Sequence, residues 1–406
     1  LAAGAFDHAR YHRRRLALAG DGALSAVTVG VLLDATRAIS RAGLGAATGI
    51  DRVERRWIEE ALAGRWGAAR FVARIASGLH HLDADAMSEV LAMLDGEAPA
   101  PRPDMRGALS LAKRPEARRI ESAVRRCARP AATARVYANV GHANLTPESV
   151  AAARAAGASR VVVLLHDAIP LEHPEFARPD GPEKMRRRLG AAEAADAVVY
   201  NSADTRARAE ARMESPPPGA VAPLGIDARK APVPPHDGFV CLGTIEPRKN
   251  HALLLGVWAR LGPGAPTLHL IGRRGWMNEE VFARLDAFPQ GVIEHGALGD
   301  GEAAALIGGA RALLFPSFAE GFGLPVGEAL ARGCPVLASD LAALREIGGE
   351  APDYLSPRDQ DGWREAVAAY AEPASPRRAA QIARIANWSA PTWADHFAAV
   401  DRVMGG

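Results

Sequence analysis

The sequence contains little cysteine and little net charge. Its 406 residues include three cysteines, Cys127, Cys241 and Cys334, and none belongs to a CxxC pair. This spacing argues against a disulfide framework and a cysteine zinc site, and it fits a reducing cytoplasm. The formal net charge of +2 gives no indication of nucleic-acid binding. We therefore expect a cytoplasmic protein without a nucleic-acid partner.

The sequence also lacks a long hydrophobic run. The most apolar stretch, residues 16–33, is interrupted by Asp21, three glycines and two hydroxyl residues. That composition does not predict a membrane-spanning helix. The basic start of the chain has no clean apolar segment, so it does not resemble a signal peptide. We expect residues 1–26 to form a poorly ordered N-terminal arm.

Short apolar runs alternate with longer Ala- and Arg-rich segments along the chain. The runs lack period-2 alternation, which indicates strands buried on both faces. Helical segments between them predict parallel sheets covered by helices on both sides, an α/β fold. The expected strands lie within residues 27–34, 71–75, 134–140, 159–167, 196–202, 239–244, 267–272, 291–296, 312–317 and 335–340.

The length and one proline-rich stretch predict two domains. A chain of 406 residues is too long for one compact core. Residues 215–238 hold seven prolines, so they read as a connection between domains. We expect domains at residues 27–230 and 236–388, with ligands bound at the carboxyl ends of their strands. The strand tips are Asp34, residues 140–142, His166, Asp167, Asn201, Ser202, residues 243–249, Gly272 and residues 316–320.

The stretch EGFGLPVGEAL, residues 320–330, predicts an anion site. It follows an expected strand, and Pro325 suits the start of a helix that Gly333 would end. Free amides and the helix dipole at such a helix start favour a phosphate, which glycines allow to approach closely. The amides belong to Gly321, Phe322, Gly323 and Leu324.

Two glutamates flank this anion site, although carboxylates repel phosphates. Both can accept hydrogen bonds from hydroxyl groups. Glu320 would bind a sugar hydroxyl and Glu328 a ribose diol, a combination that suits a sugar joined to a nucleotide by a diphosphate. In the alternative interpretation, Glu328 only complements the helix dipole and Glu320 is solvated.

Arg248 and Lys249 form a basic pair at another expected helix start. The helix dipole disfavours cations there, so the dipole does not explain them. As partners of a diphosphate they would stabilise the charge that develops when it leaves. The alternative is a surface salt bridge with Glu246.

Together these motifs carry a family resemblance. GTIEPRKNH (243–251), followed by PSFAEGFGLPVGEALARGCPVLASD (316–340), resembles the retaining glycosyltransferases of family 4. Glu320 and Glu328 match the E-x7-E signature of that family. In the first domain, residues 48–54, 161–175 and 198–205 resemble a branch with many bacterial polysaccharide enzymes. The resemblance spans roughly residues 27–403.

The resemblance implies a GT-B fold, with two Rossmann-like domains whose parallel sheets face each other across a cleft. It implies that the last helix, within residues 391–406, returns to the first domain. It also assigns roles by position. Glu320 would contact the donor sugar, residues 321–324 the diphosphate, Glu328 the ribose, and Arg248 and Lys249 the leaving diphosphate.

Further roles follow at the strand tips. His166 would line the reaction centre, although a lone histidine at a strand end is often structural. Gly243 and Thr244 would lie beside the donor, and Thr244 stands where many members carry an arginine. The resemblance implies retention by departure and attack on the same face, with the leaving phosphate taking the acceptor proton.

The first domain offers weaker candidates. GLGAATGIDR (43–52) reads GxGxxxG nine residues after its strand, so it fails the dinucleotide-binding fingerprint. We expect a flexible loop with Gly49 near the donor phosphates or the acceptor, and His142 and Asn144 facing the acceptor. Residues 102–135 carry ten Lys or Arg against three Asp or Glu. They would contact anionic lipid or form a solvated helical face.

These observations predict a cytoplasmic sugar transferase that acts on a glycan or on an acceptor carried by a polyprenyl diphosphate. GDP-mannose is the first choice of donor, from the branch resemblance alone. No cofactor or metal is expected, because the cations and loop amides would replace a metal and no DxD pair ends a strand. The alternatives are a nucleotide-sugar epimerase, a pyridoxal-dependent phosphorylase and a catalytically silent glycan-binding partner.

Overall fold

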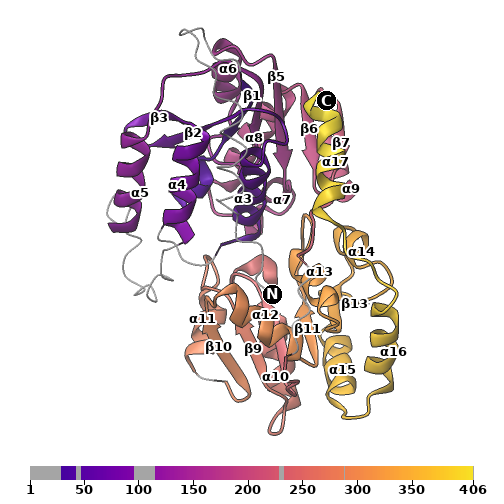
Figure 1. Cartoon of the computed structure of the whole chain (residues 1–406). Helices are drawn as coiled ribbons and strands as arrows, with labels where there is room; N and C mark the ends of the chain where they lie inside the picture. The colour runs from indigo at the N-terminus through magenta and orange to yellow at the C-terminus, as the bar shows by residue number, and fades with distance from the viewer. Residues whose placement is uncertain (1–28, 43–46, 96–114, 228–232, 288, 406) are drawn as a thin grey trace. The chain divides into compact units, whose positions relative to one another are not determined.

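The computed structural model describes residues 29–42, 47–95, 115–227, 233–287 and 289–405 (Figure 1). The predicted arm at residues 1–26 lies outside these residues, as does part of the basic stretch. Two sheets with helices around them make up the described chain. The predicted α/β class, with two domains built on parallel sheets, is confirmed.

The first sheet has seven strands in the order β3-β2-β1-β4-β5-β6-β7. β1 pairs in parallel with β2 and with β4, so that Leu33 lies opposite both Phe71 and Ala138. β3, which was not among the predicted strands, forms an antiparallel hairpin with β2. The strands are β1 (Val29–Asp34), β2 (Ala69–Ile75), β3 (Gly78–Leu82), β4 (Ala134–Asn139), β5 (Arg160–Leu165), β6 (Ala197–Tyr200) and β7 (Gly219–Val221).

The second sheet has six strands in the order β10-β9-β8-β11-β12-β13. Its pairs are all parallel. Parallel strands place their carboxyl ends on one edge, so the residues after β8 and after β11 meet there. The strands are β8 (Phe239–Leu242), β9 (Leu268–Ile271), β10 (Val292–Gly296), β11 (Ala312–Phe315), β12 (Val336–Ser339) and β13 (Asp353–Leu355).

Helices connect most of the strands, as Figure 1 shows. Those before the proline-rich stretch are α2 (Thr36–Ser40), α3 (Gly49–Leu62), α4 (Ala84–Asp95), α5 (Pro115–Arg126), α6 (Pro147–Ala155), α7 (Ile169–Glu172), η2 (Pro174–Phe176), α8 (Gly181–Glu193) and α9 (Ala203–Glu210). The later ones are η3 (Pro247–Lys249), α10 (His251–Leu261), α11 (Glu279–Asp286), α12 (Asp300–Gly309), α13 (Leu324–Ala331), α14 (Ala342–Gly348), α15 (Gln360–Ala371), α16 (Pro376–Ile385) and α17 (Trp393–Met404).

By their contacts, the residues divide into two compact units. The first unit runs to Leu164 and includes Ala194–Ala197, and the second unit holds Leu165–Glu193 and Val198–Gly406. In the second unit the core packs one face of the sheet against α10, α11 and α15, with Trp258, Trp363 and Tyr370 buried. Within the described residues, no helix is long and apolar enough to cross a membrane.

Candidate functional site

The site is built around the glycine loop, residues 320–324, which joins β11 to α13. Gly323 has a φ of 94° and precedes the first residue of α13, and only glycine adopts that conformation readily. Pro325 lies in the first turn and Gly333 follows the end of the helix, as predicted. Among the described residues, the amides of the loop from Gly321 to Leu324 donate no hydrogen bond. These amides therefore remain available to an anion.

An ion cluster of Glu246, Arg248, Lys249 and Glu320 lies beside the glycine loop. Lys249 Nζ is 2.6 Å from Glu320 Oε1, and Arg248 Nη1 is 3.0 Å from Glu320 Oε2. Arg248 also donates to Glu246 at 2.7 Å. The side chains of Glu246 and Glu320 are only 4% and 9% exposed. The alternative of a solvated Glu320 is therefore wrong. The alternative salt bridge between Arg248 and Glu246 does form, although Glu246 is buried rather than at the surface.

The opposite charges of the ion cluster stabilise the ionised form of Glu320 and of Arg248. Burial opposes ionisation of Glu320, but Arg248 and Lys249 outweigh it and lower the pKa of this carboxyl to about 2. Burial also disfavours the charged form of Arg248, yet Glu320 and Glu246 raise the pKa of its guanidinium above the usual value. Glu320 and Arg248 are therefore both ionised at neutral pH, and the cluster places Arg248 and Lys249 beside the free loop amides.

Gly243 and Thr244 lie at the end of β8, next to the cluster. A Cβ added to Gly243 would be 3.3 Å from the Lys249 side chain, so the strand end passes directly beside that cation. Thr244 packs against Gly275, where an added Cβ would be 2.7 Å from the Thr244 methyl group. The structure thus brings the predicted residues of β8, η3 and the glycine loop together.

His166 joins the same site from the end of β5. A Cβ added to Gly321 would overlap the carbonyl oxygen of His166, so only glycine permits this approach. Asn201 Nδ2 donates to the His166 carbonyl at 3.0 Å. The Gly321 carbonyl accepts from Ser202 Oγ at 2.7 Å and from Thr205 Oγ1 at 3.0 Å. These side chains hold the buried His166 against the glycine loop.

Asp167 is a site residue to which sequence reasoning gave no role. A Cβ added to Gly321 would be 3.1 Å from Asp167 Cβ, so this aspartate also borders the glycine loop. Its Oδ1 accepts from the amide of Ile169 at 3.1 Å. Burial raises the pKa of the Asp167 carboxyl, and Arg248 opposes that change. Its position directly after His166 at a strand tip was the available signal.

Glu328 lies in α13 and is partly buried, and its carbonyl accepts a hydrogen bond from Arg332 at 2.7 Å. Its assignment to a ribose stays a prediction.

The predicted first-domain residues belong to the first unit. Gly49 is the first residue of α3, and Thr48 and Asp51 form a capping box at the start of this helix. The prediction of a flexible loop is therefore wrong from Gly49 onward. Residues 43–46 lie outside the described residues. His142 Nε2 lies 3.0 Å from the Leu164 carbonyl. The Asn144 side chain donates a hydrogen bond to Asp34 and accepts one from Arg74, so within the first unit it has a structural role.

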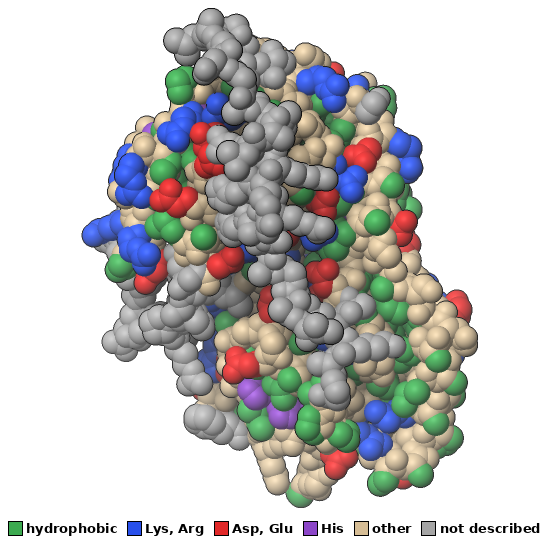
Figure 2. All heavy atoms as spheres, viewed as in Figure 1, with side chains coloured by type: hydrophobic (Ala, Val, Ile, Leu, Met, Phe, Trp, Pro, Cys, Tyr) green, Lys and Arg blue, Asp and Glu red, His purple; other side chains and the backbone are tan. Residues whose placement is uncertain are grey.

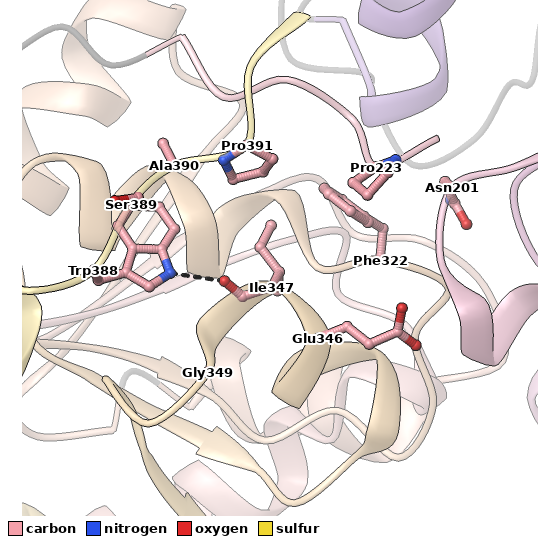
Figure 3. Close-up of a pocket in the computed structure, with 10 residues that line it drawn as sticks. All are labelled: Asn201, Pro223, Phe322, Glu346, Ile347, Gly349, Trp388, Ser389, Ala390 and Pro391. Carbon is pink, nitrogen blue, oxygen red and sulfur yellow. Dashed lines mark hydrogen bonds between the residues drawn. The ribbon is translucent and has the colours of Figure 1, made fainter. Parts of the chain in front are cut away.

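A pocket of about 460 Å³ lies beside the glycine loop in the second unit (Figure 3). Phe322 and Asn201 line it, and Trp388 donates to the Ile347 carbonyl at 2.8 Å across one wall. Neither Glu320 nor the cations line this pocket. In the described part of the chain, no group of three or more His, Cys, Asp or Glu side chains is arranged to hold a metal ion.

Residues 236–372 match the protein family described as Glycosyl transferases group 1. The serotype-specific mannosyltransferase WbdA of Escherichia coli is 29% identical over 272 residues, covering 58% of this chain and 33% of that protein. The O-antigen chain mannosyltransferase B of Escherichia coli is 34% identical over 146 residues, covering 32% of this chain and 38% of that protein. The chain spans about a third of the length of these relatives.

Two solved structures resemble nearly the whole chain. Sucrose-phosphate synthase from Thermosynechococcus elongatus has a TM-score of 0.62 at 15% identity, covering 92% of this chain and 97% of that chain. HepE from Anabaena, solved in complex with UDP, has a TM-score of 0.59 at 16% identity, covering 92% of this chain and 97% of the HepE chain. At such identities the likeness concerns the fold alone, and it confirms the predicted GT-B type.

Proposed function

We propose that this protein, which contains a glycosyl transferases group 1 domain at residues 236–372 and resembles bacterial polysaccharide glycosyltransferases, transfers a sugar from a nucleoside diphosphate to a glycan. The observation that carries the proposal is the ion cluster beside the glycine loop. Arg248 and Lys249 are fixed by the buried Glu320, next to amides that donate no hydrogen bond among the described residues. Such an arrangement suits a diphosphate.

In this proposal the diphosphate binds at the start of α13. The loop amides bind its oxygens, and Arg248 and Lys249 neutralise the charge that grows as the bond to the sugar breaks. Glu320 would accept a sugar hydroxyl while it holds the two cations, and Glu328 would bind the ribose. His166 would lie beside the sugar, because the Gly321 backbone packs on its carbonyl.

The acceptor oxygen would attack the anomeric carbon from the face that the diphosphate leaves, which retains the configuration. GDP-mannose is the proposed donor, because two relatives are named as mannosyltransferases. UDP is the nucleotide in the HepE complex, so UDP sugars belong in the test. The positive side chains and amides would replace a metal ion.

The proposed acceptor is a growing glycan or one linked to a polyprenyl diphosphate, at the inner face of a membrane. α5 supports this placement, because its apolar face is buried and its arginines are exposed. Figure 2 shows Lys and Arg side chains gathered over α5. Anionic lipid would attract this face from the cytoplasm.

Thermal unfolding with GDP, UDP, ADP or NAD in the presence of a metal chelator tests the nucleotide site. A ligand at a hundred times its dissociation constant stabilises the folded state by about 2.7 kcal/mol, which gives a clear shift. We expect a shift with GDP or UDP. A shift with NAD alone would contradict the transferase, and no shift would favour a silent glycan-binding partner.

Nucleotide release from GDP-mannose, UDP-glucose and UDP-N-acetylglucosamine then tests the reaction. We expect release that increases when a mannoside acceptor is added. An altered nucleotide sugar formed without an acceptor would instead identify an epimerase.

A further inference from the structure

Asp167 borders the ion cluster, and among the described residues no cation lies at ion-pair distance from its carboxylate. Glu246 pairs with Arg248, and Glu320 pairs with both cations. Asp167 Oδ1 accepts from the Ile169 amide, and within the described residues the aspartate forms no ion pair. Its Oδ2 is therefore left for another donor.

The position of Asp167 fits a role at the reacting atoms. It borders Gly321, and Arg248 and Glu320 both act on its charge. The residue is partly exposed, so its side chain is not sealed from ligands. Arg248 and Lys249 are already paired with Glu246 and Glu320, so the donor that suits this oxygen is a neutral one, such as a hydroxyl group.

We infer that Asp167 binds the acceptor hydroxyl and takes its proton during transfer. This inference rests on the proposed function. The acceptor O–H bond breaks as the bond from that oxygen to the anomeric carbon forms. The bond from the anomeric carbon to the diphosphate breaks, and the leaving nucleotide keeps its electron pair. The proton passes to Asp167 and then to water, so the step needs no further reactant.

The surroundings of Asp167 suit a base more than a nucleophile. Burial raises the pKa of its carboxyl, and the charge of Glu320 adds to that effect. Arg248, Arg188 and the Ile169 amide act in the opposite direction. A base works best when its pKa approaches the working pH. This assignment differs from the expectation that the leaving phosphate takes the proton, which stays a prediction.

Asp167→Asn isolates this role, because the asparagine Oδ1 can still accept from the Ile169 amide. The assay is GDP release from GDP-mannose with p-nitrophenyl α-mannoside, followed between pH 5 and 9. Asp340→Asn is the matched control, since this exposed aspartate pairs with Arg345 at the end of β12. Melting temperatures with and without GDP report folding and nucleotide binding.

We expect Asp167→Asn to lower kcat/KM for the acceptor by about 100-fold or more. The GDP-induced shift should persist, and the loss of activity at low pH should disappear. The inference would be overturned if the variant transferred sugar within about threefold of the wild-type rate and still lost activity at low pH. It would also be overturned if the variant lost the GDP-induced shift in melting temperature together with its activity. If wild type releases no nucleotide from any donor above, the proposed function fails, and the inference fails with it.

Discussion

At the scale of single residues, Glu320 has two roles. It is the buried counter-charge of Arg248 and Lys249 as well as the proposed contact to the sugar. Glu320→Gln keeps the shape and leaves two cations with one fewer partner. We expect the free energy of unfolding to fall by about 3–5 kcal/mol, the range found when a buried pair loses one member. Urea unfolding without nucleotide measures this change.

The same variant separates stability from transfer. GDP release should fall even at temperatures where the variant is fully folded, because the proposed contact to the sugar would be lost. Glu372→Gln, at an exposed position after α15, is the control and should match wild type in both measurements. Unchanged stability in Glu320→Gln would mean that Glu320 does not neutralise the cations.

Glu54 provides a pH prediction in the first unit. It is buried, and its Oε2 accepts from the Ala38 amide at 2.5 Å. Burial, followed by the nearby Asp34, raises the pKa of this carboxyl well above its ordinary value. The native state therefore holds a proton that the unfolded chain releases above about pH 4.3. Stability is full below that pH and declines as pH rises through the folded pKa.

Glu54→Gln should remove this decline, since glutamine is neutral at every pH and still accepts from the Ala38 amide. Urea unfolding at pH 5 and pH 8 is the measurement. The difference in free energy of unfolding between the two pH values should be smaller in the variant than in wild type. An equal difference would show that another group carries the pH dependence.

At the scale of the elements, the long buried strands could be predicted and the short ones could not. Runs such as residues 161–165 are apolar throughout because helices cover both faces of the sheet. β7 and β13 have three residues each, too few to leave a pattern. The start of α3 did carry a signal, because Thr48 with Asp51 three residues later is a capping box.

The site was predictable in its members but not in its contacts. The motifs indicated Arg248, Lys249 and Glu320, but spacing alone does not reveal that the cations pair with the glutamate. The hydrogen bond from Ser202 to the Gly321 carbonyl joins residues 119 positions apart. No local pattern encodes such a contact, and for the same reason Asp167 had no assigned role.

Gly321→Ala tests the contact between the glycine loop and the end of β5. The added Cβ would overlap the His166 carbonyl, and a backbone atom cannot move aside as a flexible side chain can. We expect a loss of about 1–3 kcal/mol in the free energy of unfolding, as in other overpacked sites. Nucleotide release should also fall, because the loop moves away from His166.

Gly301→Ala is the matched control. Gly301 lies in the first turn of α12, and an added Cβ would have no atom within 4 Å. This variant should keep wild-type activity, with stability unchanged or higher by up to about 1 kcal/mol. If both glycine variants behave alike, the close packing of Gly321 has no effect of its own.

At the scale of the whole molecule, the small net charge hides an uneven distribution. The chain has a formal charge of +2, yet residues 102–135 carry ten Lys or Arg and three Asp or Glu. The remaining residues are therefore negative on balance. Only part of this stretch is described, and there the four arginines of α5 are exposed while Ile120 and Val124 are buried. An uneven charge of this kind favours one orientation at an anionic surface.

Vesicle binding tests whether this face recognises lipid. The protein should bind vesicles that contain phosphatidylglycerol and should not bind phosphatidylcholine alone. Replacing Arg118, Arg119, Arg125 and Arg126 by alanine should weaken binding on the order of 100-fold or more, since each basic residue contributes about 1 kcal/mol near such a surface. Raising the salt concentration to about 0.5 M should release the wild type, because the Debye length then falls to a few ångströms. Equal binding of wild type and variant would mean that α5 is only a solvated helical face.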